Sequence, residues 1–264
     1  MIVITPSLNL HGFLKRIPLV RERVLMLDYD GTLAPFQVRR ERALPYPGVA
    51  AALKELLDGG GTRVVIVSGR RAEELVPLLG LERPPEIWGC HGWERLLSTG
   101  DIRKQPLSAS DAAALDEAVR AAGDFVLGAA RIERKTASIA LHWRGLPVLH
   151  IARVRKQAEV IWSALAERDG MELLRFDGGI ELCARGCNKQ HAVKAVLSET
   201  GPDSAIAYLG DDVTDEDAFS VVKARGIGVL VRPEYRETGA DVWIRPPHGL
   251  LSFIKHWRVQ REFA

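Results

Sequence analysis

The stretch 25-LMLDYDGTLAPF-36 ends an apolar run with two carboxylates and a Gly-Thr turn. The aliphatic and β-branched residues 24–27 predict a short buried strand. Asp28 and Asp30 follow this strand two residues apart, and an extended chain directs side chains with that spacing to the same face. The stretch therefore predicts a strand that presents a pair of carboxylates at its carboxyl end.

Strands and helices alternate along the first hundred residues. Apolar runs predict strands at 62–70 and 86–94, and amphipathic patterns predict helices at 49–60 and 72–80. This order implies a parallel sheet with right-handed crossovers. The same alternation returns late in the chain, where we expect helices or strands at 188–201, 204–212, 215–226, 227–233 and 241–247.

The pattern differs in the middle of the chain. We expect a helix, a strand, a long helix and a hairpin at 108–122, 131–144, 148–168 and 171–184. The hairpin is indicated by two β-prone runs around Asp177-Gly178-Gly179. Strands that adjoin without helices between them indicate a separate α+β unit. The sequence therefore predicts an α/β core that is interrupted by an inserted module and then completed.

The composition indicates a globular protein without a strongly charged partner. Hydrophobic residues make up 47% of the 264, and the net charge is only +2. That balance argues against nucleic acid as a partner, which usually requires a clear basic excess. The N-terminus lacks a signal-peptide pattern, and no apolar run approaches the roughly 18 residues of a membrane helix. We therefore expect a soluble cytoplasmic protein with no membrane partner.

Three cysteines are present, Cys90, Cys183 and Cys187. An odd number at this spacing does not indicate a disulfide framework. The pair Cys183 and Cys187 would make half of a metal site, but no second ligand pair with suitable spacing follows. Buried, unreactive thiols are the interpretation that we favour.

A second acidic cluster, Asp211, Asp212 and Asp215, follows the apolar run 205–210. Because ligands bind beyond the carboxyl ends of the strands in an open parallel sheet, both clusters are expected at such an edge. Crowded carboxylates repel one another, and a divalent cation with oxygen ligands relieves the repulsion; Mg²⁺ fits best. For either cluster alone, a solvated turn or a set of helix N-caps is the alternative.

Four segments in this order resemble the motifs of the haloacid dehalogenase superfamily of phosphotransferases. They are 28-DYDGTL-33, 66-IVSGR-70, 187-CNKQ-190 and 210-GDDVTDEDAF-219. The resemblance implies a Rossmann-like core formed by residues 1–105 and 185–264, with a smaller α+β cap domain of the C2B type inserted at 106–184. Such a cap closes over the site and selects the leaving group.

The resemblance also implies roles for four residues. Asp28 would attack phosphorus, and Asp30 would protonate the leaving oxygen and then activate water. Ser68 would hydrogen-bond the phosphoryl group, and Lys189 would place positive charge on it and on Asp28. Taken singly, a serine after a strand is usually a turn residue, and a lysine in the first turn of a helix is usually exposed.

The same resemblance implies a Mg²⁺ cofactor. Its expected ligands are the Asp28 carboxylate, the backbone carbonyl of Asp30 and the Asp211 carboxylate. Asp215 would support the metal from behind these ligands, and Asp212 is the alternative for that position.

A closer resemblance is to trehalose-6-phosphate phosphatases, over roughly residues 24 to 250. It rests on 28-DYDGTLAPF-36, 67-VSGR-70, 91-HGWE-94, 133-ERKTASIALHWR-144 and 210-GDDVTDEDAF-219. The implied sugar-binding positions in the inserted module are Glu133, Lys135 and Glu181, with His142 and Arg144 as further candidates. Those in the core are Arg70 and His91. An ordinary exposed strand face is the alternative for Lys135.

The resemblance implies a phosphatase that releases trehalose from trehalose 6-phosphate, the last step of trehalose biosynthesis. Gln190 departs from the family, which usually has glycine after the lysine of the third motif, and we expect this residue to alter the shape of the cleft. Two alternatives remain open. One is a related phosphatase acting on sucrose phosphate, mannosyl-phosphoglycerate or a hexose phosphate. The other is a non-catalytic phosphosugar-binding subunit that accompanies a trehalose-phosphate synthase.

Overall fold

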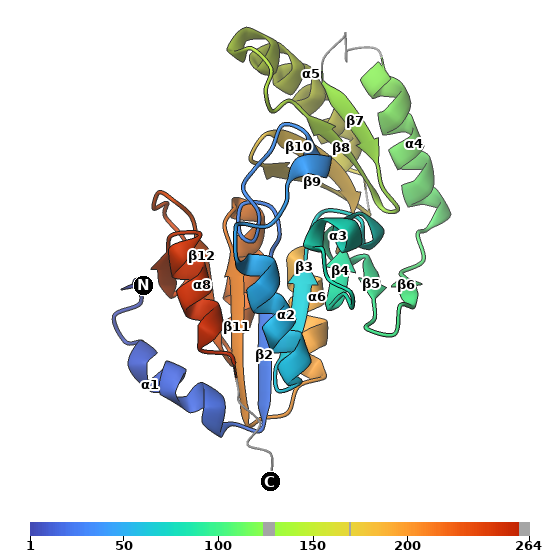
Figure 1. Ribbon diagram of the computed structural model, residues 1–264. Coiled ribbons are helices and arrows are strands. Elements are labelled where there is room, and N and C mark those ends of the chain that lie inside the picture. Colours follow the sequence, from blue (N-terminus) through green and yellow to red (C-terminus); the bar gives the residue numbers. More distant parts are fainter. Residues whose placement is uncertain (124–129, 169, 259–264) are drawn as a thin grey trace. The chain divides into compact units, whose positions relative to one another are not determined.

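The computed structural model describes residues 1–123, 130–168 and 170–258 and divides into two compact units (Figure 1). The first unit comprises Met1–Arg103 with Lys189–Ala264, and the second comprises Lys104–Asn188. The sequence places the boundaries at 105/106 and 184/185. Both boundaries differ by a few residues, since the second unit begins at Lys104 and ends at Asn188.

Among the described residues, nine strands form the sheet of the first unit, in the order β1-β13-β12-β11-β2-β3-β4-β5-β6. Its parallel strands are β2 (Glu22–Leu27), β3 (Arg63–Val67), β4 (Glu86–Gly89), β11 (Ser204–Gly210), β12 (Ile227–Val231) and β13 (Val242–Ile244). The predicted parallel sheet is thus confirmed. The edges add β1 (Ile2–Val3), β5 (Glu94–Leu96) and β6 (Ile102–Lys104), which the sequence analysis did not predict.

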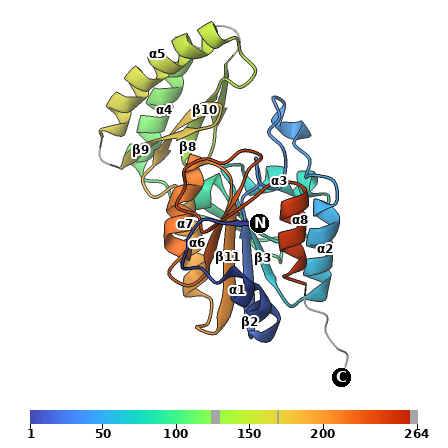
Figure 2. The ribbon, with the colours of Figure 1, turned by 90° about the vertical axis from the view of Figure 1, so that its left-hand side faces the viewer.

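Helices cover both faces of this sheet (Figure 2). One face packs α2 (Val49–Gly59), α3 (Ala72–Leu79) and α8 (His248–Lys255), and the other packs α6 (Lys189–Ser198) and α7 (Glu216–Val222). Strand β2 serves both layers, because Leu25 and Leu27 point into one core and Val24 and Met26 into the other. Helices α8 and α1 (Leu10–Arg16) were not predicted.

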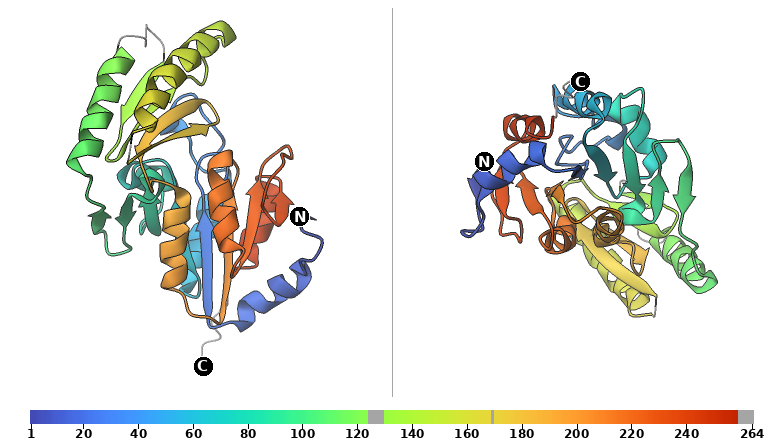
Figure 3. Two further views of the ribbon diagram at one scale, coloured as in Figure 1. Left: turned by 180° about the vertical axis from the view of Figure 1, so that it is seen from behind. Right: turned by 90° about the horizontal axis from the view of Figure 1, so that it is seen from below.

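The second unit is a four-stranded antiparallel sheet in the order β7-β8-β10-β9 with two helices on one face (Figure 3). Its elements are α4 (Ala109–Gly123), β7 (Arg131–Arg134), β8 (Ser138–His142), α5 (Val148–Ala166), β9 (Met171–Phe176) and β10 (Gly179–Ala184). The hairpin predicted at 171–184 is confirmed. The single strand predicted at 131–144 is wrong, because the chain turns where the Lys135 amide donates to the Ser138 carbonyl and forms two paired strands.

All three cysteines are buried, as predicted, and none belongs to a disulfide within the described residues. In the described part of the chain, no helix combines the length and the apolar character that crossing a membrane requires.

Candidate active site

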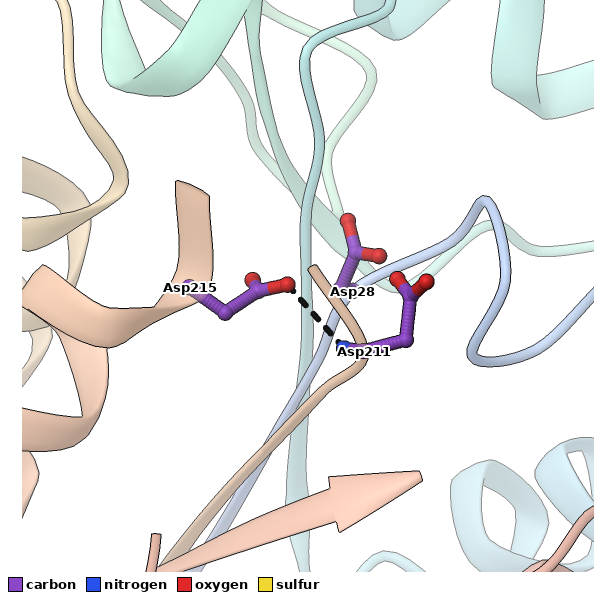
Figure 4. A group of neighbouring side chains, drawn as sticks. All are labelled: Asp28, Asp211 and Asp215. Carbon is purple, nitrogen blue, oxygen red and sulfur yellow. Dashed lines mark hydrogen bonds between the residues drawn. The ribbon is translucent and has the colours of Figure 1, made fainter. Parts of the chain in front are cut away.

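The carboxyl ends of β2 and β11 bring the two acidic segments together. These strands pair in parallel with Leu27 opposite Leu209, and the Asp28 amide donates to the Leu209 carbonyl at 2.8 Å. Asp28, Asp211 and Asp215 each offer a carboxylate oxygen, and these oxygens lie within 4.8 Å of one another (Figure 4). Three acidic side chains from segments about 180 residues apart therefore lie together in one buried site at the carboxyl ends of the strands.

Lys189, the first residue of α6, provides the positive charge at this place. Its Nζ donates to Asp28 Oδ1 and to Asp215 Oδ1, both at 2.7 Å. The lysine is only 4% exposed, and Asp28 is 3% exposed. The structure thus removes the interpretation of Lys189 as a solvent-exposed helix residue, since its ammonium group bridges two buried carboxylates.

Both carboxylate oxygens of Asp215 accept hydrogen bonds. The Tyr208 hydroxyl donates to its Oδ1 at 2.5 Å, and the amides of Asp211 and Asp212 donate to its Oδ2 at 3.0 Å. Asp212 caps the short 3₁₀ turn Val213–Asp215 with its own side chain. The geometry therefore favours Asp215 over Asp212 as the residue that supports the acidic loop.

Asp211 is the carboxylate whose oxygens are least occupied. Among the described residues, its buried Oδ1 has no hydrogen-bond partner, although buried carboxylate oxygens are normally paired. The chain approaches the other oxygen closely at Gly31, where φ is +86° and a Cβ would lie 2.1 Å from Asp211 Oδ2. An unsatisfied buried anionic oxygen beside Asp28 is what a hard divalent cation with oxygen ligands would complete, so the residues present fit Mg²⁺.

Burial and mutual repulsion dominate the electrostatics. Burial raises the pKa of Asp28 to about 7; Lys189 opposes this shift and Asp215 adds to it. Burial and the charges of Asp28 and Asp215 raise the pKa of Asp211 well above its usual range. Burial would lower the pKa of Lys189, but the carboxylates of Asp215 and Asp28 outweigh it and raise that pKa. The cluster therefore holds more negative charge than one lysine neutralises.

Asp30 forms an ion pair with Arg70. The guanidinium donates from Nε to Asp30 Oδ2 and from Nη2 to Oδ1, both at 2.6 Å, and from Nη1 to the Arg40 carbonyl at 2.9 Å. Burial would raise the pKa of Asp30, but the hydrogen bonds and charge of Arg70 outweigh it and lower the pKa. The resemblance implies that Arg70 binds substrate, whereas the structure places its guanidinium on Asp30, the carboxylate that the resemblance implies as acid and base.

Ser68 and His91 lie on neighbouring loops at the same sheet edge. Ser68 follows β3 and is 1% exposed, and its Oγ accepts from the Arg70 amide at 3.2 Å. His91 follows β4, is 6% exposed, and donates its backbone amide to the Ser68 carbonyl at 2.9 Å. The two loops therefore hydrogen-bond to each other through their backbones.

Four of the five predicted sugar-binding residues of the second unit form two pairs. Lys135 Nζ donates to both carboxylate oxygens of Glu181, at 2.9 and 3.0 Å, and the Ser138 hydroxyl donates to Glu181 Oε1 at 2.5 Å. His142 Nε2 lies 2.7 Å from Glu133 Oε2. In β10, Ile180 and Leu182 pack toward the helices, so Glu181 between them lies on the opposite sheet face.

The Arg144 guanidinium lies 3.6 Å from the Asp177 carboxylate, and it also donates to the Asp177 carbonyl in the β9–β10 turn. This places Arg144 at the end of the sheet rather than in either pair.

Sequence reasoning missed several residues that order the site. Tyr208 lies within a buried apolar run, where a tyrosine hydroxyl needs a partner, and that need was the available signal. Arg236 donates to the carbonyls of Asp211 and Asp212 at 3.1 and 2.7 Å and to Glu216 at 2.5 Å. Nothing local in the sequence distinguishes Arg236 from the other surface arginines.

A parallel sheet with an inserted α+β unit, and carboxylates with a buried lysine at its carboxyl edge, define the haloacid dehalogenase class of phosphatases. The trehalose-phosphatase family model matches residues 26–240. The chain belongs to this family.

Two curated relatives agree with this assignment, and a solved structure shares the fold. A trehalose-phosphate phosphatase of Mycobacterium ulcerans is 31% identical over 87% of the chain and 60% of its own length. A bifunctional trehalose-6-phosphate synthase/phosphatase of Thermoproteus tenax is 31% identical over 90% of the chain and 32% of its own length. The C-terminal domain of C. albicans trehalose-6-phosphate phosphatase superposes with a TM-score of 0.82 at 21% identity, covering 97% and 98% of the two chains. The chain spans between 19% and 60% of the length of the first curated relatives that it matches.

Proposed function

We propose that this protein hydrolyses trehalose 6-phosphate to trehalose and phosphate in a Mg²⁺-dependent reaction. The observation that carries the proposal is the buried cluster of Asp28, Asp211 and Asp215 with Lys189 at the sheet edge, in a chain of the trehalose-phosphatase family. A phosphoryl group carries negative charge, so carboxylates can attack it only where their own charge is offset. Lys189 and a bound Mg²⁺ would together offset the charge of this cluster.

Asp28 attacks phosphorus, and the resulting aspartyl phosphate is then hydrolysed. Lys189 lies 2.7 Å from the attacking carboxylate and offsets charge there as the phosphoryl group approaches. Ser68 donates its hydroxyl to a phosphoryl oxygen. When bound by Asp28, Asp211 and the Asp30 carbonyl, with Asp215 behind them, Mg²⁺ supplies Lewis-acid stabilisation of the phosphoryl charge.

Asp30 acts in both halves of the reaction. Its ion pair with Arg70 keeps it ionised, which is the form needed to take a proton from the water that hydrolyses the aspartyl phosphate. To protonate the leaving sugar oxygen, Asp30 must first leave the guanidinium and take up a proton. Arg70 therefore favours the base role over the acid role.

The second unit acts as a cap that reads the sugar. A sugar offers many hydroxyls and little apolar surface, so its recognition requires charged hydrogen-bonding groups. Glu133, Lys135 and Glu181 supply such groups on one sheet face, with His142 joined to Glu133. Arg144 at the end of the sheet is the remaining candidate for a sugar contact.

Phosphate release from trehalose 6-phosphate, with Mg²⁺ and with EDTA, is the direct test. Sucrose, glucose and mannosyl-glycerate phosphates in the same assay decide between this substrate and the rival sugar phosphates. The Asp28→Asn variant should lose activity, whereas Asp203→Asn, the same change at a side chain 70% exposed, should retain it. An Asp28→Asn variant as fast as the parent would refute the mechanism.

A non-catalytic phosphosugar-binding subunit is the second candidate. The bifunctional relative carries synthase and phosphatase in one name, which supports a functional link between this chain and a trehalose-phosphate synthase. Calorimetric binding of trehalose 6-phosphate without any phosphate release would favour that candidate. A cytoplasmic location stays a prediction.

A further inference from the structure

The turn that follows β4 has an unusual backbone. In the described ranges, Cys90 and His91 are the two non-glycine residues with positive φ, at 49° and 54°. A non-glycine residue in this conformation is strained, and the strain persists only where the surrounding structure imposes it. Both side chains are buried. Two consecutive left-handed residues at a proposed active-site edge indicate that the position of this turn matters.

The turn is bonded to the loop that carries Ser68. The Cys90 amide donates to the Arg70 carbonyl at 2.8 Å, and the His91 amide donates to the Ser68 carbonyl at 2.9 Å. These two bonds tie the turn to both ends of the three-residue loop 68–70. The left-handed conformations therefore bring the His91 side chain over the middle of that loop.

The ring of His91 lies directly against Gly69. A Cβ at Gly69 would lie 2.6 Å from both Cε1 and Nε2 of the ring. The φ of Gly69 lies outside the positive range, so its backbone would accept alanine and only the ring excludes it. The contact thus limits where the loop backbone can lie.

The position of this loop sets two groups of the proposed reaction. It carries Ser68, whose hydroxyl faces the Arg70 amide, and it carries Arg70, whose guanidinium holds Asp30. A shift of the loop by about 1 Å would misplace both, and errors of that size can cost about 100-fold in rate.

We infer that His91 is a positioning residue whose ring fixes the backbone of loop 68–70 and thereby places Ser68 and Arg70. The inference rests on the proposed phosphoryl-transfer role of that loop. It gives His91 a role inside the core, in place of the sugar contact that the family resemblance implies. The strain at Cys90 and His91 is the cost of holding the ring against Gly69.

A double-mutant cycle tests the contact. Gly69→Ala, His91→Ala and the double variant are assayed with p-nitrophenyl phosphate, which has no sugar. Gly69→Ala should lower kcat by roughly 10- to 100-fold, because the new methyl group must displace the ring or the loop. The double variant should recover several-fold over Gly69→Ala, since its methyl group enters the space that the ring left. If the kcat losses of the two single variants simply multiply in the double variant, the inference is overturned.

A comparison of His91→Ala with His91→Gly separates positioning from stability. Both lack the ring, but glycine relieves the left-handed strain, so His91→Gly should unfold at a higher temperature. Their kcat values should agree within about twofold, because rate depends on the ring. If kcat instead followed the unfolding temperature, His91 would be only a structural residue. Gly123→Ala is the matched control, because a Cβ there meets nothing within 4 Å.

The outcome can be distinguished from a failure of the proposed function. If the protein hydrolyses p-nitrophenyl phosphate but not trehalose 6-phosphate, the proposed substrate is refuted. The double-mutant cycle can still be measured with p-nitrophenyl phosphate in that case. If neither ester is hydrolysed, calorimetric binding of inorganic phosphate to the same four proteins replaces kcat. Affinity that falls in Gly69→Ala and recovers in the double variant supports the inference, and affinity unchanged by Gly69→Ala overturns it.

Discussion

Lys189→Met would leave two buried carboxylates without the cation that they share. The Lys189 ammonium lies 2.7 Å from both Asp28 and Asp215 and is 4% exposed. Removing one partner of a buried ion pair costs about 3–5 kcal/mol, because the remaining charge stays out of water without compensation. For a domain of 150–250 residues this corresponds to a fall of roughly 6–20 °C in the unfolding midpoint.

A surface pair of equally short length gives the matched control. Lys54 and Asp58 form an ion pair at 2.5 Å on α2, but their side chains are 55% and 64% exposed. Water solvates both partners, so Lys54→Met should leave the unfolding midpoint almost unchanged. The difference in unfolding midpoint between Lys189→Met and Lys54→Met therefore measures the effect of burial rather than that of the distance within the ion pair.

Thermal unfolding in EDTA at pH 6 and pH 8 is the assay, since a bound divalent cation would mask the loss. Burial raises the pKa of Asp28 to about 7, so the folded protein retains a proton there that the unfolded chain loses at lower pH. The stability that this proton gives is lost as pH rises through 7. Without Lys189 the pKa of Asp28 rises further, and the cost of Lys189→Met should be greater at pH 8. A Lys189→Met midpoint no lower than that of Lys54→Met would refute the reasoning.

Three further outcomes are expected. Mg²⁺ at about 100 times its dissociation constant should stabilise the protein by about 2.7 kcal/mol in thermal unfolding, and Asp211→Asn should remove most of this gain. Gly31→Ala should destabilise the fold by at least about 1–3 kcal/mol and abolish phosphate release, because φ is +86° and the new Cβ would meet Asp211 Oδ2. Gly100→Ala carries the same strain at φ +94° with nothing within 4 Å, so it should retain activity. Glu133→Ala should raise KM for trehalose 6-phosphate far more than for p-nitrophenyl phosphate, and Glu159→Ala on α5 should change neither; equal losses on both esters would assign Glu133 to the fold.

The hairpin of β7 and β8 shows where sequence patterns fail. The run 131–144 contains no glycine, proline or asparagine to mark a turn. A pattern of that kind is compatible with one long strand or with two paired ones. The structure decides for two, since β7 pairs with β8 across the turn and β8 pairs in turn with β10.

Sequence patterns were sufficient to predict the alternation of buried strands and helices and the acidic residues at the strand ends. Both are local properties, because side-chain periodicity and the end of an apolar run are set by neighbouring residues. A parallel sheet follows from that alternation, and a carboxyl edge rich in acids follows from the sheet. Asp28, Asp30, Asp211 and Asp215 were therefore within reach of sequence reasoning.

The tertiary structure alone decided which charged groups meet. It made β2 and β11 neighbours, directed Lys189 to Asp28 and Asp215, and gave Arg70 to Asp30. The chain contains many arginines and acidic residues that the sequence does not distinguish from one another. Which of them form ion pairs depends on distances between segments far apart in the sequence. Those distances result from packing all helices on both faces of the sheet at once, which no local pattern encodes.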